Sequence, residues 1–150
     1  MSKHSYTRCW LHLIWATLKR ERTLHREACR KISNFLSEYA QSKEIYMKIN
    51  FVNADHVHAL IDLPANYSIE EVAHLLKGAS SHWINQNEII TGRFSWGRGY
   101  AVFSVSHSQL AKIIDYIIHQ EQHHHTKTFA QEYEEFIKAY GLQLPREINR

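Results

Sequence analysis

Two histidines separated by one residue, His56 and His58, are the side chains in this sequence whose spacing most directly suggests metal chemistry. They begin segment 56–63, in which apolar residues alternate as in a β-strand. Side chains alternate along a strand, so both imidazoles emerge on one face, about 6.5–7 Å apart at the backbone. Two such rings can converge on one metal ion, while the apolar Val57 faces the core. The pair alone is a modest signal, and a metal site needs a third ligand.

A predicted helix that runs from Ser106 or Ser108 to about residue 124 offers that ligand and a nucleophile. Tyr116 and Gln120 are four residues apart, which places them on one helix face, about 5–6 Å from each other. The Gln120 carbonyl oxygen can bind a metal, and the Tyr116 phenol can attack a phosphodiester that the metal polarises. The structural alternative is that Tyr116 packs among the neighbouring isoleucines and Gln120 is a solvated helix residue.

The elements around these residues predict an α+β fold. The pattern indicates strands at 6–18, 45–52, 56–63 and 100–105, and helices at 25–42, 68–83, 106–124 and 128–140. Ser68 and Glu71 are expected to form a capping box at the start of the second helix, and Ser106 or Ser108 to cap the third. The order is that of ferredoxin-like and RRM-like βαββαβ domains, with an antiparallel sheet, helices on one face, and C-terminal helices that carry the tyrosine. The length favours one domain over residues 1–150.

Charge and cysteine content narrow the class of protein. Residues 1–31 hold eight Lys and Arg against two Glu, which makes polyanion binding plausible, although a solvated basic face explains the same pattern. Cys9 and Cys29 have neither metal-type nor redox-type spacing, and no secretion signal is visible, so we expect a cytoplasmic protein. The apolar runs are too short for a membrane span.

Five segments, taken in order, resemble one family, the HUH-type single-tyrosine transposases of the insertion-sequence 200/605 group, including repeat-associated tyrosine transposases. The segments are His-Leu-Ile-Trp-Ala-Thr at 12–17 with Lys19 and Arg20, Asp-His-Val-His at 55–58, Leu-Lys-Gly-Ala-Ser-Ser at 76–81, Ser-Trp to Gly-Tyr at 95–100, and Tyr-Ile-Ile-His-Gln at 116–120 with His123 and His124. Each segment is a weak signal, but the five together are specific.

The resemblance implies a metal-dependent nuclease that cleaves and rejoins single-stranded DNA. It implies that His56 and His58 are metal ligands, that Gln120 completes the site, that Tyr116 is the nucleophile, and that the ion is Mg²⁺ or Mn²⁺. It also implies a homodimer that recognises DNA hairpins. Two alternatives stay open: a non-catalytic single-strand-binding module or domesticated relative, and a hydrolase of small phosphoesters that uses water as its nucleophile.

Residues expected to contact DNA cluster in and near a Gly-rich, aromatic stretch. Lys77, Arg93 and Arg98 are candidates for phosphate contacts, and Trp96 and Tyr100 for base stacking. The ordinary alternative for Trp96 is that it fills the core. His12, earlier in the chain, is expected to be a hydrogen-bonded sheet histidine rather than a ligand.

Overall fold

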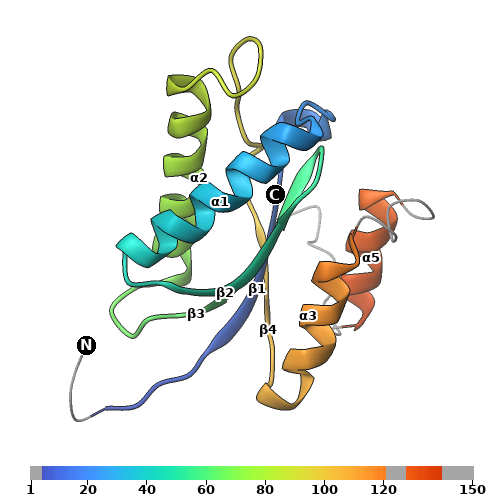
Figure 1. The fold of residues 1–150 in the computed structure, drawn as a ribbon. Helices are drawn as coiled ribbons and strands as arrows, with labels where there is room; N and C mark the ends of the chain where they lie inside the picture. The colour runs from blue at the N-terminus through green and yellow to red at the C-terminus, as the bar shows by residue number, and fades with distance from the viewer. Residues whose placement is uncertain (1–4, 121–127, 140–150) are drawn as a thin grey trace, which may run out of the picture.

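A four-stranded antiparallel sheet forms the centre of the molecule in the computed structural model, which describes residues 5–120 and 128–139. The sheet order is β2-β3-β1-β4, so β1 and β3 are the inner strands (Figure 1). The strands are β1 (Trp10–Ala16), β2 (Tyr46–Val52), β3 (His56–Asp62) and β4 (Ala101–Ser104). This arrangement confirms the predicted α+β, ferredoxin-like fold.

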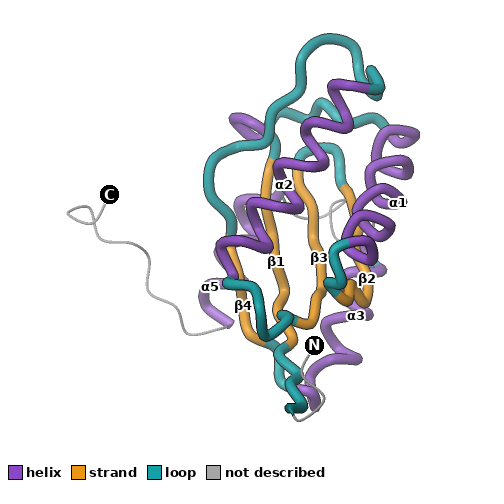
Figure 2. The backbone as a smooth tube through the Cα atoms, turned by 90° about the vertical axis from the view of Figure 1, so that its left-hand side faces the viewer, coloured by secondary structure: helices purple, strands orange, loops and turns teal. Residues whose placement is uncertain are grey.

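Helices cover both faces of the sheet, as Figure 2 shows. The helices α1 (Arg26–Ser42) and α2 (Ile69–Gln86) lie on one face, and α3 (Leu110–Ile118) and α5 (Phe129–Ala139) lie on the other. Short 3-10 turns, η1 (Leu18–Arg20) and η2 (His107–Gln109), follow β1 and precede α3. Within the described residues, we find no helix long and apolar enough to cross a bilayer.

The helix starts show one correct and one wrong prediction. Ser68 and Glu71 form the expected capping box before α2, with each side chain bonded to the other residue's backbone N–H. Neither Ser106 nor Ser108 caps α3, because their hydroxyls bond each other at 3.1 Å and η2 intervenes. The helix α3 therefore begins at Leu110 without a side-chain cap.

The inner strands are buried on both faces, which explains their apolar content. Leu13 and Val57 face α1 and α2 in the larger core cluster, whereas Ile14 and Leu60 face the α3 and α5 side. Strand alternation therefore places His56 and His58 on the α3 and α5 side and Val57 beneath them, as the pattern predicts.

The larger core should be sensitive to the loss of side-chain volume at Leu36 of α1, which has no solvent exposure. We expect Leu36→Ala to lower the free energy of unfolding by about 2–5 kcal/mol, because it removes buried methyl groups and leaves a cavity. Urea denaturation measures this change. The exposed Glu38→Ala on the same helix is the control, and an equal loss in both variants would contradict the predicted packing.

Candidate metal centre

The two histidines of β3 meet as a buried pair. His56 and His58 both have 0% solvent exposure, and their ring centroids lie 5.0 Å apart with an interplanar angle of 73°. Because β3 pairs with β2 and β1 on its two sides, the backbone that carries the rings is fixed. The pair is thus a buried site, carried by the paired strands of the sheet, of the kind that can hold a cation.

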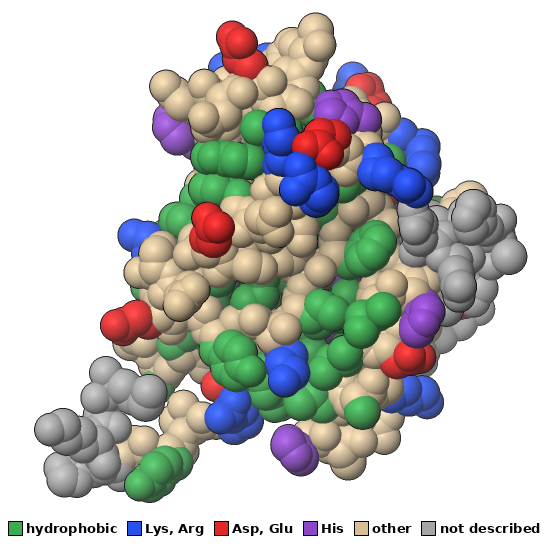
Figure 3. Space-filling model, viewed as in Figure 1, with side chains coloured by type: hydrophobic (Ala, Val, Ile, Leu, Met, Phe, Trp, Pro, Cys, Tyr) green, Lys and Arg blue, Asp and Glu red, His purple; other side chains and the backbone are tan. Residues whose placement is uncertain are grey.

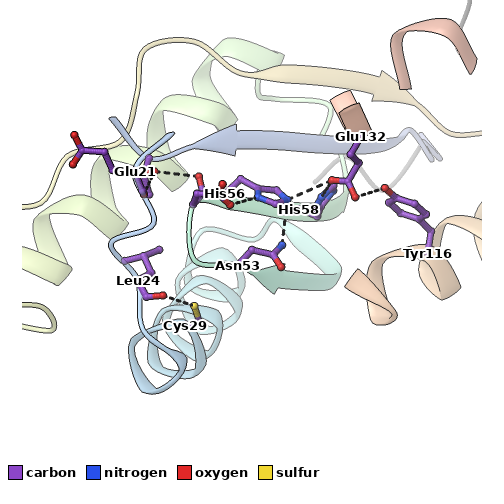
Figure 4. A network of polar contacts seen from close by, with 10 residues as sticks. Glu21, Leu24, Cys29, Asn53, His56, His58, Tyr116 and Glu132 are labelled. Carbon is purple, nitrogen blue, oxygen red and sulfur yellow. Dashed lines mark hydrogen bonds and ion pairs between the residues drawn. The ribbon is translucent and has the colours of Figure 1, made fainter. Parts of the chain in front are cut away.

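The ring of His56 is oriented by the residues that precede it. Its Nδ1 lies 2.7 Å from Asp55 Oδ1, an arrangement in which the N–H donates to the carboxylate and Nε2 is turned toward the site. The Asn53 amide nitrogen lies 3.3 Å from that Nε2 (Figure 4). Burial lowers the pKa of His56, but the carboxylates of Asp55 and Glu132 outweigh burial and raise it above the ordinary value.

His58 is oriented by a third histidine, His12 on β1. His12 Nε2 lies 2.8 Å from His58 Nδ1, which leaves His58 Nε2 to face the site. Burial and the nearby His58 hold the pKa of His12 well below its usual range, despite an opposing effect of Glu132, so the ring is neutral and its Nε2 can accept a hydrogen bond from the N–H at His58 Nδ1. His12 is the sheet histidine we expected, and it supports the candidate ligand.

A carboxylate from α5 joins the pair. Glu132 is 1% exposed, and its Oε1 lies 3.4 Å from His56 Nε2 and 3.1 Å from His58 Nε2. The ligand atoms of the three residues all lie within 4.8 Å of one another. Burial raises the pKa of Glu132, but the hydrogen bonds from both histidines and from Tyr116 outweigh it and lower the pKa, so the group is ionised.

These separations fit a small divalent ion. Ligand atoms about 2.1 Å from a common ion lie roughly 3.0–3.4 Å apart at octahedral or tetrahedral angles. The separations of Glu132 Oε1 from the two Nε2 atoms, 3.4 and 3.1 Å, fall in that range. Two imidazoles and one carboxylate also supply a donor set that divalent transition-metal ions accept, Mn²⁺ among them.

Tyr116 lies at the edge of this group (Figure 4). Its hydroxyl donates to Glu132 Oε2, and its ring centroid lies 6.1 Å from that of His58. Burial first, and then the Glu132 carboxylate, raise the pKa of Tyr116 well above its ordinary value, while a hydrogen bond from Gln120 opposes the rise. The phenol is therefore neutral, and its hydroxyl is held by a carboxylate that accepts its hydrogen bond.

The helix that carries Tyr116 ends at Ile118, not at about residue 124, so Gln120 lies beyond α3. Gln120 is fully buried beside Tyr116, with its amide nitrogen 3.4 Å from the Tyr116 carbonyl oxygen, and its role as a metal ligand stays a prediction. Glu132 was not predicted as a site residue, because it lies 74 residues from His58 and is one of three Glu in residues 132–135. Among the other histidines, His119 bonds the Asp115 carbonyl oxygen at 2.8 Å, and 123–125 lie outside the described residues.

Lys77 holds the Gly-rich stretch in place. Its ammonium group donates to the carbonyl oxygens of Gly97 and Gly99 at 2.9 and 2.8 Å, and burial lowers its pKa. Gly97 crosses the end of β1, where an added Cβ would lie 3.2 Å from the Thr17 carbonyl oxygen. The glycine therefore permits a close backbone approach within the fold.

The remaining residues expected to contact DNA divide into core and surface positions. Trp96 is 8% exposed and bonds Ser80 Oγ at 2.9 Å, so its ring fills the core, as the ordinary alternative held. Tyr100 is half-buried against the larger core. Arg93 and Arg98 are exposed and accessible to a ligand.

Solved structures share this fold. A crystal structure of a transposase candidate from Deinococcus radiodurans superposes with a TM-score of 0.64 and 26% identity, covering 80% of this chain and 96% of that one. The structure of a REP-associated tyrosine transposase bound to a REP hairpin has a TM-score of 0.60 and 12% identity, covering 83% and 74%. The second likeness concerns the fold alone.

Sequence relatives define the family. The chain is 30% identical over 122 residues to the transposase for insertion sequence element IS200 of Salmonella typhimurium, covering 78% of this chain and 80% of the relative. It is 28% identical over 117 residues to the ISDra2 transposase TnpA of Deinococcus radiodurans, covering 75% and 82%. Residues 5–120, well over half of the chain, match the family described as "Transposase IS200 like". The chain therefore belongs to the IS200-like transposases.

Proposed function

We propose that this transposase is a metal-dependent single-strand DNA endonuclease that cleaves and rejoins DNA through a covalent 5′-phosphotyrosine at Tyr116. One observation supports it above all: a single carboxylate, Glu132, contacts His56, His58 and the Tyr116 hydroxyl. Neither a passive binding module nor a hydrolase that activates water requires a phenol at this place.

The metal, Mg²⁺ or Mn²⁺, would be held by His56 and His58 together with Glu132 or Gln120. When bound, it would supply Lewis acidity to a non-bridging phosphate oxygen. Asp55 and His12 fix the orientation of the two imidazoles, and such supporting bonds would strengthen metal binding.

Tyr116 provides the attacking atom. Its Oη forms the bond to phosphorus while the bond to the 3′ oxygen breaks, and that oxygen leaves as a 3′-hydroxyl once it takes a proton. Glu132 Oε2, which already accepts the phenol hydrogen bond, is placed to receive the Tyr116 proton. The phosphotyrosine retains the energy of the broken linkage, so a 3′-hydroxyl can later reverse the step and rejoin DNA.

The substrate we propose is single-stranded DNA that bears a hairpin. A structure of the same fold is that of a tyrosine transposase bound to a REP hairpin, and the family acts on insertion sequences. We retain Lys77, Arg93, Arg98 and Tyr100 as candidate DNA contacts, with Lys77 acting through the loop that it holds. Trp96 is left out because its ring is buried.

We also propose a cytoplasmic homodimer with one domain over residues 1–150, on the grounds given by the resemblance and the composition. A single chain already brings Tyr116 beside its own His58, so the dimer is not needed to form the site in this arrangement. Ile118 of α3 is 51% exposed and is a candidate for the subunit contact.

An adduct assay tests the proposed function. The protein is incubated with hairpin-bearing single-stranded oligonucleotides and Mn²⁺, and a denaturing gel is used to detect protein covalently joined to DNA. We expect an adduct that is absent when EDTA removes the metal. Cleavage without an adduct would favour the hydrolase alternative, and binding without cleavage would favour the binding module.

The third ligand can be identified by direct Mn²⁺ titration. We expect Glu132→Gln to weaken Mn²⁺ binding by roughly 10-fold or more, since it removes a buried charge that faces both imidazoles. Gln120→Ala should have a smaller effect, because its amide lies beside the Tyr116 backbone. Calorimetry on the two variants compares them, and a larger loss in Gln120→Ala would assign the ligand to Gln120.

A further inference from the structure

A groove of about 770 Å³ lies beside the candidate metal centre, between the first part of α1 and the end of β2. Its volume falls within the range of ligand sites, about 300–1,000 Å³. The lining includes Arg22, Arg26, Arg30, Asn34, Phe51 and Asn53. The proposed chemistry at Tyr116 uses none of the arginines, so the groove needs its own explanation.

The chemistry of the groove suits a polyanion that also carries hydrogen-bonding groups. Arg22, Arg26 and Arg30 line it, and Arg30 is paired with Glu27, whereas the one acidic residue of the lining, Asp55, accepts a hydrogen bond from His56. Figure 3 shows Lys and Arg side chains gathered around the N-terminal end of α1, together with an acidic side chain. Arginine binds phosphate through planar, bidentate hydrogen bonds, and Asn34 adds an exposed amide of the kind that hydrogen-bonds bases.

The groove leads to the candidate metal centre. Asn53 and Asp55 line it, and both also contact His56. In Figure 4, Asn53 lies between His56 and the helix that carries Cys29. A chain lying in the groove would therefore end at the turn between β2 and β3, next to the two residues that orient His56.

We propose that this groove binds unpaired nucleotides of the DNA strand that flank the scissile phosphate, with Arg22 and Arg26 on backbone phosphates and the exposed Asn34 amide available to a base. The inference rests on the proposed function, since it names how the substrate strand reaches the same site. It also accounts for part of the positive charge concentrated in residues 1–31.

Salt-dependent binding tests the arginines. The probe is an oligothymidylate of about 12 nucleotides, within the range of single-strand site sizes. Binding is measured in EDTA with chains that carry Tyr116→Phe, so neither metal nor cleavage contributes. We expect Arg22→Gln with Arg26→Gln to weaken binding and to reduce the slope of log affinity against log salt by about 1.4, because each lost phosphate contact removes about 0.7.

A matched variant separates the groove from net charge. Lys31→Gln with Lys43→Gln removes the same charge from exposed positions on or just after the same helix, outside the groove lining. Arg30 is left unchanged in both, because its guanidinium pairs with Glu27 at 2.5 Å. The inference would be overturned if log affinity fell with log salt at the same slope in both double variants. It would also be overturned if the protein with unsubstituted arginines did not bind the oligothymidylate.

Thiol protection tests the location. Cys29 lines the groove, but burial raises the pKa of its thiol to about 11, which makes it a slow probe. We therefore expect the oligothymidylate to slow alkylation of Asn34→Cys, in the groove, but not of Lys31→Cys on the same helix. Peptide mapping by mass spectrometry separates both from the exposed Cys9. Equal alkylation of Asn34→Cys with and without the oligonucleotide would overturn the placement.

The two proposals fail in different ways. A chain that binds the oligothymidylate in the groove but never forms an adduct contradicts the covalent mechanism and supports the groove. If the protein forms the adduct, but the arginine and lysine double variants bind the oligothymidylate with the same salt dependence, only the proposed role of the groove is contradicted.

Discussion

Tyr116→Phe is expected to abolish the covalent protein–DNA adduct and to lower strand cleavage by roughly 10⁴–10⁶-fold, the scale seen when an enzyme loses its nucleophile. The substitution removes only the hydroxyl that donates to Glu132 and leaves the half-buried ring in its packing beside His58. Folding and DNA binding should therefore be retained. The measurements are adduct yield on a denaturing gel and oligonucleotide affinity in EDTA.

Tyr133→Phe is the matched control, since Tyr133 of α5 is partly buried against the same small cluster as Tyr116. It should form the adduct at close to the unsubstituted rate. Cleavage by Tyr116→Phe at the normal rate would reject the phosphotyrosine mechanism, and loss of the adduct in both variants would show that packing, not the Tyr116 hydroxyl, is what matters.

His56→Ala is expected to lower cleavage by about 10²–10³-fold and to weaken Mn²⁺ binding. A metal that polarises phosphate contributes several kcal/mol to the transition state, and about 1.4 kcal/mol corresponds to each factor of ten. The variant deprives the site of one of its two imidazoles, whose Nε2 lies 3.4 Å from Glu132 Oε1. Single-turnover cleavage and Mn²⁺ calorimetry measure the two effects.

His74→Ala on the exposed face of α2 is the control and should leave both quantities unchanged. Because His56 is fully buried, circular dichroism of the metal-free variant must show an intact fold, and His56→Gln serves as a second variant that keeps more of the side-chain volume. Normal Mn²⁺ affinity in a folded His56 variant would remove this residue from the metal site.

Local patterns in the sequence were sufficient to predict the elements and the direction of several side chains. Alternation along β3 placed both histidines on one face and Val57 in the core, because a pleated strand turns successive residues to opposite sides. The capping box at Ser68 marked the start of α2 for a similarly local reason. With four strands and their connecting helices in order, the ferredoxin-like fold followed.

Local sequence patterns could not predict the contacts between segments that lie far apart in the chain. His12 meets His58 only because β1 pairs with β3 in a register that places Ile14 opposite His58, and no local pattern fixes that register. Trp96 and Lys77 have types that suit DNA, yet the structure turns one into the core and bonds the other to the Gly-rich stretch. Residue type and spacing do not reveal which face a loop presents.

Glu132 shows most clearly which part of the site depends on the tertiary structure and not on local sequence. The sequence determined that two imidazoles share a strand face, because the alternation along a strand is short-range. It wrongly continued the helix of Tyr116 through Gln120, since α3 ends at Ile118. Only the packing of α5 against the sheet brought a carboxylate to within 3.1 Å of His58 Nε2 across 74 residues of chain. That contact depends on how whole helices dock, which is a property of the complete core and not of any one segment.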